Sequence, residues 1–254
     1  MIDVHTHILW GLDDGAKTRA DSLAMLKIAA DSGTTGLVAS PHADLQFKYD
    51  AALVDDRIAD LNAATGGVPK LYRGCDFHLS LENIQDALRD PSKFTIHRGP
   101  YLLVEFADIF IPSTTDEVFR QFLDRGIVPV ITHPERNPIL QDHLERVAHW
   151  VEMGCLAQVT AQSLTDRFGK AAQHAAWRLL RDNLVHVIAS DAHDTVHRPP
   201  RLDLARDLLK REFGADTADL LLQRNPEALL AGLPTSLPEA TQQAPEKRWY
   251  EFWR

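Results

Sequence analysis

The chain opens with residues 1–16, MIDVHTHILWGLDDGA, where an apolar run carries two histidines one residue apart and two aspartates follow. Residues 2–7 have the character of a short buried strand, and residues spaced by two along a strand point to the same side. His5 and His7 therefore share one face. A strand with a polar solvent face would explain this pattern, and so would a metal site at the end of a strand. The rest of the chain decides between the two.

Six further apolar stretches follow, and amphipathic helix candidates alternate with them. The predicted strands are Ile2–His7, Gly36–Ser40, Lys70–Gly74, Tyr101–Phe106, Val128–Thr132, Leu156–Thr160 and Val185–Ala189. The predicted helices are Arg19–Ser32, Ala52–Ala64, Leu81–Arg89, Thr115–Arg125, Gln141–Met153, Ser163–Asp182, Pro200–Phe213 and Asp216–Gln223, with a short terminal helix in NPEALLAG. This alternation predicts an α/β fold with a parallel sheet, and so many units close most economically into a TIM-like barrel.

Composition is that of an ordinary globular protein of 254 residues, with 44% hydrophobic and 25% charged residues. The formal net charge of -9 argues against a protein that binds the nucleic-acid backbone. Cys75 and Cys155 belong to no paired motif, so a reducing compartment is expected. No leader pattern precedes the first strand, and no apolar run approaches the length of a membrane span. We therefore expect a cytoplasmic protein that is not integral to the membrane.

The composition changes after residue 232. Residues 235–247, TSLPEATQQAPEK, are rich in Pro, Gln and Thr and predict a flexible linker. The final residues, RWYEFWR, hold four aromatic side chains in seven positions. Such a cluster is either disordered or docks a partner. We expect one domain over residues 1–232, followed by a linker and aromatic tail over residues 233–254.

Metal-ligating side chains stand at or just beyond the C-terminal ends of six of the seven predicted strands. In chain order they are His5, His7, Asp13, Asp14, His42, Asp76, Glu105, His133, Asp191 and His193. The remaining strand offers only Gln158 and Thr160. All strand C-termini of a parallel barrel meet on one face, so we expect these side chains to form a single site.

The chemistry of these side chains indicates which cations they would hold. They offer imidazole nitrogens and carboxylate oxygens without a thiolate, which favours Mn, Fe or Zn over Ca or Mg. The set is too large for one ion, so two or three divalent ions are expected, with Glu105 as a bridging ligand. A lone buried glutamate is costly to ionise, but a neighbouring dication reverses that cost.

Several motifs resemble a known family. MIDVHTHILWGLDDGA, SPH, VEF, HPER and LVHVIASDAHDTVHRPP occur in the order found in the PHP-type metal-dependent protein tyrosine phosphatases of bacterial capsule and exopolysaccharide operons. Histidinol phosphatases and polymerase-associated PHP domains share the His-x-His and Asp-x-His elements, whereas DDGA and RPP favour the tyrosine phosphatase branch. The resemblance implies a distorted barrel of seven βα units, with the active site at the strand C-termini and a trinuclear, commonly manganese-activated centre.

The resemblance also implies three ligand sets. One ion would be held by His5, His7, Glu105 and Asp191, and its neighbour by His42, His133 and the bridging Glu105. A third, more loosely held ion would be bound by Asp14, Asp76 and His193. Asp76 departs from the glutamate usual in the family, and its shorter side chain reaches less far.

The implied reaction is direct attack of a metal-activated hydroxide on phosphorus. Neither cysteine lies in a Cys-x5-Arg phosphate loop. Arg136 and Arg198 would bind the phosphoryl oxygens, because a guanidinium matches two oxygens at once. The alternative for Arg136 is a surface ion pair with Glu135, and Arg201 could replace Arg198. The leaving phenolate would take its proton from His193 or from a metal-bound water.

The expected function is hydrolysis of phosphotyrosine on protein. The expected partner is the C-terminal tail of the autophosphorylated bacterial tyrosine kinase that controls polysaccharide export. The alternatives are a small-molecule phosphatase, such as one for histidinol phosphate, and a metal-containing scaffold protein that uses its aromatic tail. A nuclease role is opposed by the acidic charge. Four histidines are predicted to lie away from the site: His143, His149, His174 and His186. His78 and His97 are in predicted loops that could approach the substrate, although we expect them to lie away from it, and His197 lies close to the site in sequence.

Overall fold

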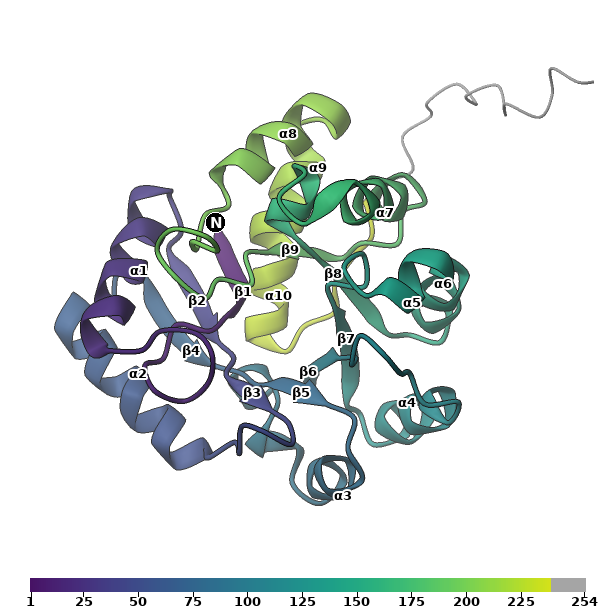
Figure 1. Cartoon of the computed structure of the whole chain (residues 1–254), viewed down its shortest axis with the longest axis horizontal. Helices are drawn as coiled ribbons and strands as arrows, with labels where there is room; N and C mark the ends of the chain where they lie inside the picture. The colour runs from purple at the N-terminus through teal and green to yellow at the C-terminus, as the bar shows by residue number, and fades with distance from the viewer. Residues whose placement is uncertain (239–254) are drawn as a thin grey trace, which may run out of the picture.

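The computed structural model describes residues 1–238, so the predicted aromatic tail lies outside the described residues. Strands occupy the centre of the molecule and helices surround them (Figure 1). Over residues 1–238, no helix is long and apolar enough to cross a membrane. Of the predicted linker, residues 233–238 are described, and Ser236 exchanges two hydrogen bonds with the buried Asn225 side chain.

The strands form two parallel sheets. They are β1 (Ile2–Thr6), β2 (Gly36–Ala39), β3 (His42–Ala43), β4 (Lys70–Arg73), β5 (Asp76–His78), β6 (Tyr101–Glu105), β7 (Val128–Thr132), β8 (Leu156–Thr160) and β9 (Val187–Ala189). One sheet has the order β1-β2-β4 and the other the order β3-β5-β6-β7-β8-β9. Each strand pair in both sheets is parallel, which confirms the predicted α/β class.

Helices follow the strands along the chain, and most lie around them, whereas α10 overlaps the strands at the centre of the view (Figure 1). They are α1 (Arg19–Asp31), α2 (Ala51–Thr65), α3 (Leu81–Arg89), α4 (Thr115–Asp124), α5 (Pro138–Asp142), α6 (Leu144–Glu152), α7 (Gly169–Arg181), α8 (Asp203–Phe213), α9 (Ala215–Asp219) and α10 (Asn225–Ala231). The local sequence explains where several of these helices begin. Thr18 and Asp21 form a capping box at α1, and the Asp50 side chain accepts two backbone N–H groups at the start of α2.

The second and third predicted strands continue beyond the ends expected from sequence. Each breaks and resumes as a short strand, β3 or β5, in the other sheet. Pro41, at the first break, has no N–H to donate. At the second break, a Cβ on Gly74 would lie 2.4 Å from Val38 Cγ1, so only glycine fits there. These breaks place His42 at the start of β3 and Asp76 at the start of β5.

Two predicted helices are also divided. The stretch Gln141–Met153 breaks at His143, whose extended φ of -134° separates α5 from α6. Asn137 caps α5 and Pro138 occupies its first turn, so this helix begins earlier than predicted. The stretch Ser163–Asp182 separates into a 3₁₀ turn, η3 (Ala161–Leu164), and α7. The loop between η3 and α7 carries Phe168, which matters at the site below.

A layer of apolar side chains joins the two sheets beneath the strand C-termini. It includes Val4 and Val38 from the first sheet, and Leu103, Val130 and Val187 from the second, all fully buried in one contiguous cluster. Larger side chains, including Phe77, Phe119 and Trp150, pack in a second cluster that involves the surrounding helices. The strand ends above the inner layer are therefore held on a rigid base.

The chain returns to its first strand after β9. The backbone N–H of His7 donates to the Ala192 carbonyl at 2.8 Å, and the N–H of Asp191 donates to the His5 carbonyl at 2.9 Å. The buried Asp3 carboxylate also accepts the N–H of Ser190 at 3.0 Å. These bonds connect the outer strand of one sheet with the outer strand of the other.

His186, just before β9, gives the fold a predictable response to acid. Burial lowers the pKa of His186 to about 4, and its Nδ1 accepts the N–H of Ala157 at 3.2 Å. The unfolded chain takes up this proton near pH 6.5, so the stabilisation is complete above that pH and is lost as pH falls toward 4. We expect a loss of about 3 kcal/mol in unfolding free energy from this group over that window.

Urea denaturation of His186→Asn at pH 7 and pH 4 measures this contribution. Asn keeps an acceptor for Ala157 but does not titrate, so the variant should lose less stability on acidification than the parent. The matched control is His174→Asn, at an exposed position on α7. Equal acid sensitivity in parent and His186→Asn would contradict the assignment.

Candidate metal centre

The nine predicted metal-ligating side chains lie together at the C-terminal ends of the strands. Each belongs to a group of three or four whose potential ligand atoms all lie within 4.8 Å of one another. They are His5, His7, Asp14, His42, Asp76, Glu105, His133, Asp191 and His193. The parallel topology therefore brings together residues that are far apart in sequence.

Asp76 lies at the centre of this cluster. Its Oδ2 is 3.3 Å from His5 Nε2 and 3.3 Å from His42 Nδ1, and its side chain is fully buried. Neither Asp76 oxygen, nor His42 Nδ1, has a hydrogen-bond partner within residues 1–238. A buried carboxylate without donors is costly, and a cation removes that cost. The donor set thus fits divalent cations.

Asp191 and Glu105 make the other close approaches to histidine. Asp191 Oδ1 lies 3.4 Å from His7 Nε2 and 3.5 Å from His5 Nε2. Glu105 Oε1 lies 3.4 Å from His133 Nε2, and Glu105 Oε2 lies 3.3 Å from His42 Nδ1. Glu105 therefore faces two histidines with its two oxygens, which is the arrangement that a bridging ligand requires.

Asp14 is the most exposed member of the cluster. Its side chain is 51% exposed, whereas that of Asp76 is 0% exposed. Asp14 Oδ1 lies 3.4 Å from His42 Nε2 and 3.3 Å from His193 Nε2. The geometry groups Asp76 with the buried His5 and His7 and with the partly buried His42 and Glu105, whereas the sequence resemblance grouped it with Asp14 and His193.

A tight loop after β1 delivers the two aspartates of DDGA. Ala16 donates its N–H to the His7 carbonyl at 3.1 Å, and a Cβ on Gly15 would lie 2.0 Å from that same oxygen. Glycine is therefore required where the loop crosses His7. The crossing turns Asp13 inward beneath His7 and leaves Asp14 toward solvent.

Asp13 and Gln158 orient the first two histidines, a role that sequence reasoning missed. Asp13 Oδ2 lies 2.8 Å from His7 Nδ1, and Gln158 Oε1 lies 3.0 Å from His5 Nδ1. Each acceptor favours the tautomer with Nδ1–H, which leaves Nε2 free to bind a metal. The available signal for Gln158 was an amide inside an otherwise apolar strand.

The protonation states of His133, Glu105 and His193 are consistent with ligand roles. Burial, followed by the charge of Arg136, lowers the pKa of His133 to about 3, so its imidazole is neutral. Burial and Asp76 oppose ionisation of Glu105, but the neighbouring imidazoles of His42 and His78 hold the Glu105 pKa at about 2. His193 Nδ1 lies 3.0 Å from the Asp191 carbonyl oxygen, which leaves Nε2 as an acceptor. That tautomer favours His193 as a ligand rather than a proton donor.

Both predicted arginines reach the cluster. Arg136 Nη1 and Arg198 Nη2 each donate to Asp191 Oδ2, and both guanidinium groups lie beside the Phe168 ring, at 4.3 and 5.8 Å from its centroid. Arg201, the alternative to Arg198, pairs with Asp203 in this structure, its Nε donating to Asp203 Oδ1 at 3.1 Å. Sequence reasoning missed Phe168, which lies in a loop with no motif of its own.

The alternative partner of Arg136 is engaged elsewhere. Glu135 is fully buried, and its Oε1 accepts hydrogen bonds from Ser163 Oγ at 2.7 Å and from the N–H of Thr160 at 2.9 Å. A surface ion pair between Arg136 and Glu135 is therefore the wrong description. Glu135 instead ties the HPER loop to η3.

His78 was predicted to lie away from the site and does not. Its Nε2 is 2.5 Å from Glu105 Oε2, because β5 runs past the predicted strand end and pairs His78 with Glu105 in register. His97 lies against Tyr72, and His143 and His149 pair with Glu145 and Asp116, away from the cluster as predicted.

Removing the charge of Asp13 should weaken metal binding without removing a ligand. We expect Asp13→Asn to lower metal affinity by about 10- to 100-fold, because His7 would lose the carboxylate that fixes its ring. Calorimetric titration of metal-depleted protein with Mn²⁺ measures this. Asp166→Asn, at an exposed ion pair with Lys170, is the control. Unchanged affinity in Asp13→Asn would mean that His7 needs no such support.

Comparisons with known proteins agree with this geometry. Residues 1–231 match the family model described as capsular polysaccharide synthesis, CpsB/CapC. The chain is 33% identical to tyrosine-protein phosphatase YwqE of Bacillus subtilis (strain 168), over 91% of each chain. It is 30% identical to the putative tyrosine-protein phosphatase CapC of Staphylococcus aureus, over 98% of this chain and 99% of that protein.

A solved structure gives the same relationship in three dimensions. It comes from a study of YwqE from Bacillus subtilis and CpsB from Streptococcus pneumoniae, described there as unique metal-dependent tyrosine phosphatases. The two structures superpose with a TM-score of 0.87 at 31% identity, covering 94% of this chain and 98% of the other. The family resemblance inferred from the sequence motifs is thus confirmed, and the chain belongs to the CpsB/CapC family of capsular polysaccharide synthesis.

Proposed function

We propose that this chain is a metal-dependent phosphomonoesterase that hydrolyses phosphotyrosine on protein. The observation that carries the proposal is the cluster around Asp76, where histidine and carboxylate ligands lie beside two arginines that share one aspartate. The relatives named tyrosine-protein phosphatases cover nearly the whole chain, which supports the same reaction here.

Two to three divalent ions would occupy the cluster, with manganese the best candidate and iron or zinc also suited to these donors. The metal ligands would be His5, His7, Asp14, His42, Asp76, Glu105, His133, Asp191 and His193. Bound divalent ions supply Lewis-acid polarisation of the phosphoryl group and lower the pKa of water.

The chain's own residues would orient the substrate around those ions. Arg136 and Arg198 would bind the phosphoryl oxygens, since each guanidinium offers a fork of donors and the Phe168 ring restricts both. His193 is a candidate catalytic residue because it lies beside Asp14 and Arg198. Its tautomer favours the role of metal ligand over that of proton donor. Neither cysteine takes part, because Cys75 and Cys155 are both buried.

The two sheets would form one distorted (β/α)7 barrel. The apolar layer shared by Val4, Val38, Leu103 and Val187 supports this proposal, as do the backbone bonds between His5 and Asp191 and between His7 and Ala192. In such a barrel the strand C-termini form the active-site face, where the cluster lies.

The substrate would be the phosphorylated C-terminal tail of a bacterial tyrosine kinase that governs capsule or exopolysaccharide synthesis. The family description, capsular polysaccharide synthesis, supports this partner. The reaction would take place in the cytoplasm, where the free thiols of Cys75 and Cys155 stay reduced.

The test is turnover by protein whose metal content has been measured by elemental analysis. With Mn²⁺, we expect phosphotyrosyl peptide to be hydrolysed much faster than histidinol phosphate. His7→Ala should lose activity and bound metal together. Faster turnover of histidinol phosphate would favour a metabolite phosphatase, and hydrolysis of neither substrate nor of p-nitrophenyl phosphate would overturn the enzymatic proposal.

A further inference from the structure

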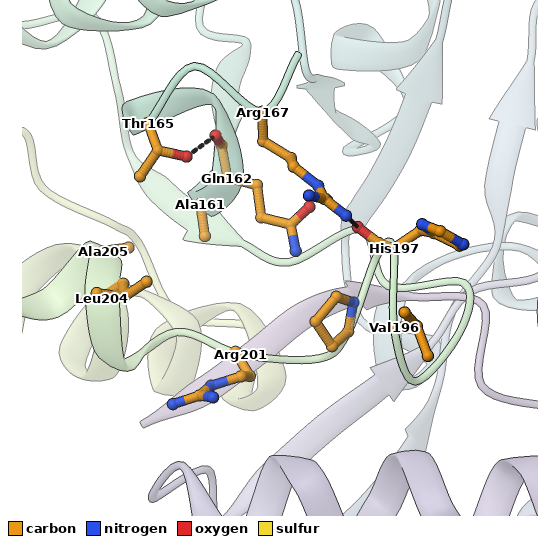
Figure 2. A pocket seen from close by; sticks show the side chains of 10 residues that line it. Ala161, Gln162, Thr165, Arg167, Val196, His197, Arg201, Leu204 and Ala205 are labelled. Atoms are coloured by element: carbon orange, nitrogen blue, oxygen red, sulfur yellow. Dashed lines mark hydrogen bonds between the residues drawn. The ribbon is translucent and has the colours of Figure 1, made fainter.

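A pocket lies next to the loop that carries Arg198, outside the metal cluster. It has a volume of about 270 Å³ and opens between η3, the loop before α7, residues 196–201 and the start of α8 (Figure 2). The residues that line it are Ala161, Gln162, Thr165, Arg167, Val196, His197, Pro199, Arg201, Leu204 and Ala205. Its size suits a single side chain rather than a folded partner.

This pocket adjoins the proposed phosphate site through the chain itself. His197 and Pro199 line the pocket, and Arg198 between them donates to Asp191. The Asp194 carboxylate accepts the N–H groups of Val196 and Arg198, and Arg167 donates twice to the His197 carbonyl at 3.0 and 3.2 Å (Figure 2). A loop held by these hydrogen bonds therefore separates the pocket from the metal cluster.

The walls of the pocket are largely aliphatic. Ala161, Pro199, Leu204 and Ala205 supply them, and Leu204 remains 63% exposed although it is a large hydrophobic residue. An occupant that offers an aliphatic side chain would contact these walls and cover the exposed part of Leu204.

The charged residues at the pocket are already engaged. Arg167 is committed to the His197 carbonyl, and Arg201 pairs with Asp203. An acidic occupant would therefore compete with existing bonds, whereas an apolar one would not. This difference favours an aliphatic side chain over a carboxylate.

We propose that this pocket binds an apolar side chain of the substrate protein, close in sequence to the phosphotyrosine, and thereby selects among protein substrates. The proposal rests on the proposed function. When the phosphate is held by Arg136 and Arg198, the substrate chain crosses the 196–199 loop and places a neighbouring residue against Leu204.

A set of phosphotyrosyl peptides tests the proposed subsite. Each peptide carries a single leucine, at one of the positions from three before to three after the phosphotyrosine. In a Gly/Ser background, leucine at one position should raise kcat/KM about tenfold over serine, the scale of one well-buried aliphatic contact. Leu204→Asp should abolish that preference and lower the ratio of peptide to p-nitrophenyl phosphate kcat/KM by about tenfold. Leu204→Ala should lower it less.

The matched control is Leu233→Asp, a leucine of similar exposure (58%) that follows α10. It should keep the leucine preference. The pocket assignment fails if no position prefers leucine, if glutamate is preferred there, or if the preference survives in Leu204→Asp. Equal hydrolysis of all the peptides would contradict only the proposed subsite. Hydrolysis of p-nitrophenyl phosphate without any peptide turnover would contradict the proposal that the substrate is a protein.

Discussion

Asp76→Asn should lose part of its bound metal and lower kcat/KM on p-nitrophenyl phosphate by at least about 100-fold. The side chain is fully buried, its Oδ2 lies 3.3 Å from both His5 Nε2 and His42 Nδ1, and its oxygens accept no hydrogen bond within the described part of the chain. Changes to residues that only orient metal ligands cost about 10- to 100-fold, so loss of a carboxylate that itself binds the metal should cost more. Elemental analysis and steady-state kinetics on the same preparation measure both effects.

A change at an exposed aspartate provides the control. Asp60→Asn removes a surface ion pair with Arg19 and should alter neither metal content nor kcat/KM. If Asp76→Asn binds a full complement of metal with unchanged affinity, then Asp76 is not a ligand. The isolated carboxylate would then need another explanation.

Arg136→Ala should lower kcat/KM by about 10²- to 10³-fold while the metal content stays the same. One preorganised donor to a developing oxyanion is worth about this much, and the guanidinium lies beside Asp191 and Phe168, at the edge of the cluster. Arg136→Lys should recover little of the loss, because an ammonium cannot form the paired bonds of a guanidinium. Kinetics on aryl phosphate together with elemental analysis separate this result from that of Asp76→Asn.

An exposed arginine supplies the comparison for this prediction. Arg120→Ala, which removes a surface contact with Glu117, should leave kcat/KM unchanged. Loss of metal in Arg136→Ala, in parallel with loss of activity, would show that Arg136 supports Asp191 rather than the phosphoryl group.

The location of the site was predictable because of a property of parallel strands. His42, Glu105 and His133 are far apart in sequence, but each follows or ends an apolar run, and the C-termini of such runs meet on one face. Side-chain alternation then places His5 and His7 together. These rules depend on backbone direction and periodicity, both of which are readable from residue type.

The supporting contacts were not predictable by the same rules. His78 reaches Glu105 only because the third predicted strand breaks at Gly74, after β4, and resumes as β5 in the other sheet. Asp13 lies beneath His7 because the loop crosses at Gly15. Such contacts depend on strand register and loop path, which residue type does not specify. The grouping of ligands around Asp76 likewise depends on side-chain reach.

The backbone bonds between the first strand and the segment after β9 have a consequence for how the molecule assembles. They join His5 to Asp191 and His7 to Ala192, which are more than 180 residues apart in the chain. Closing so long a loop is entropically costly and slows folding. A chain that lacks Asp191 would therefore lack part of the cluster. Divalent ions bound by the assembled cluster would stabilise the native state, so thermal stability should rise with free metal concentration.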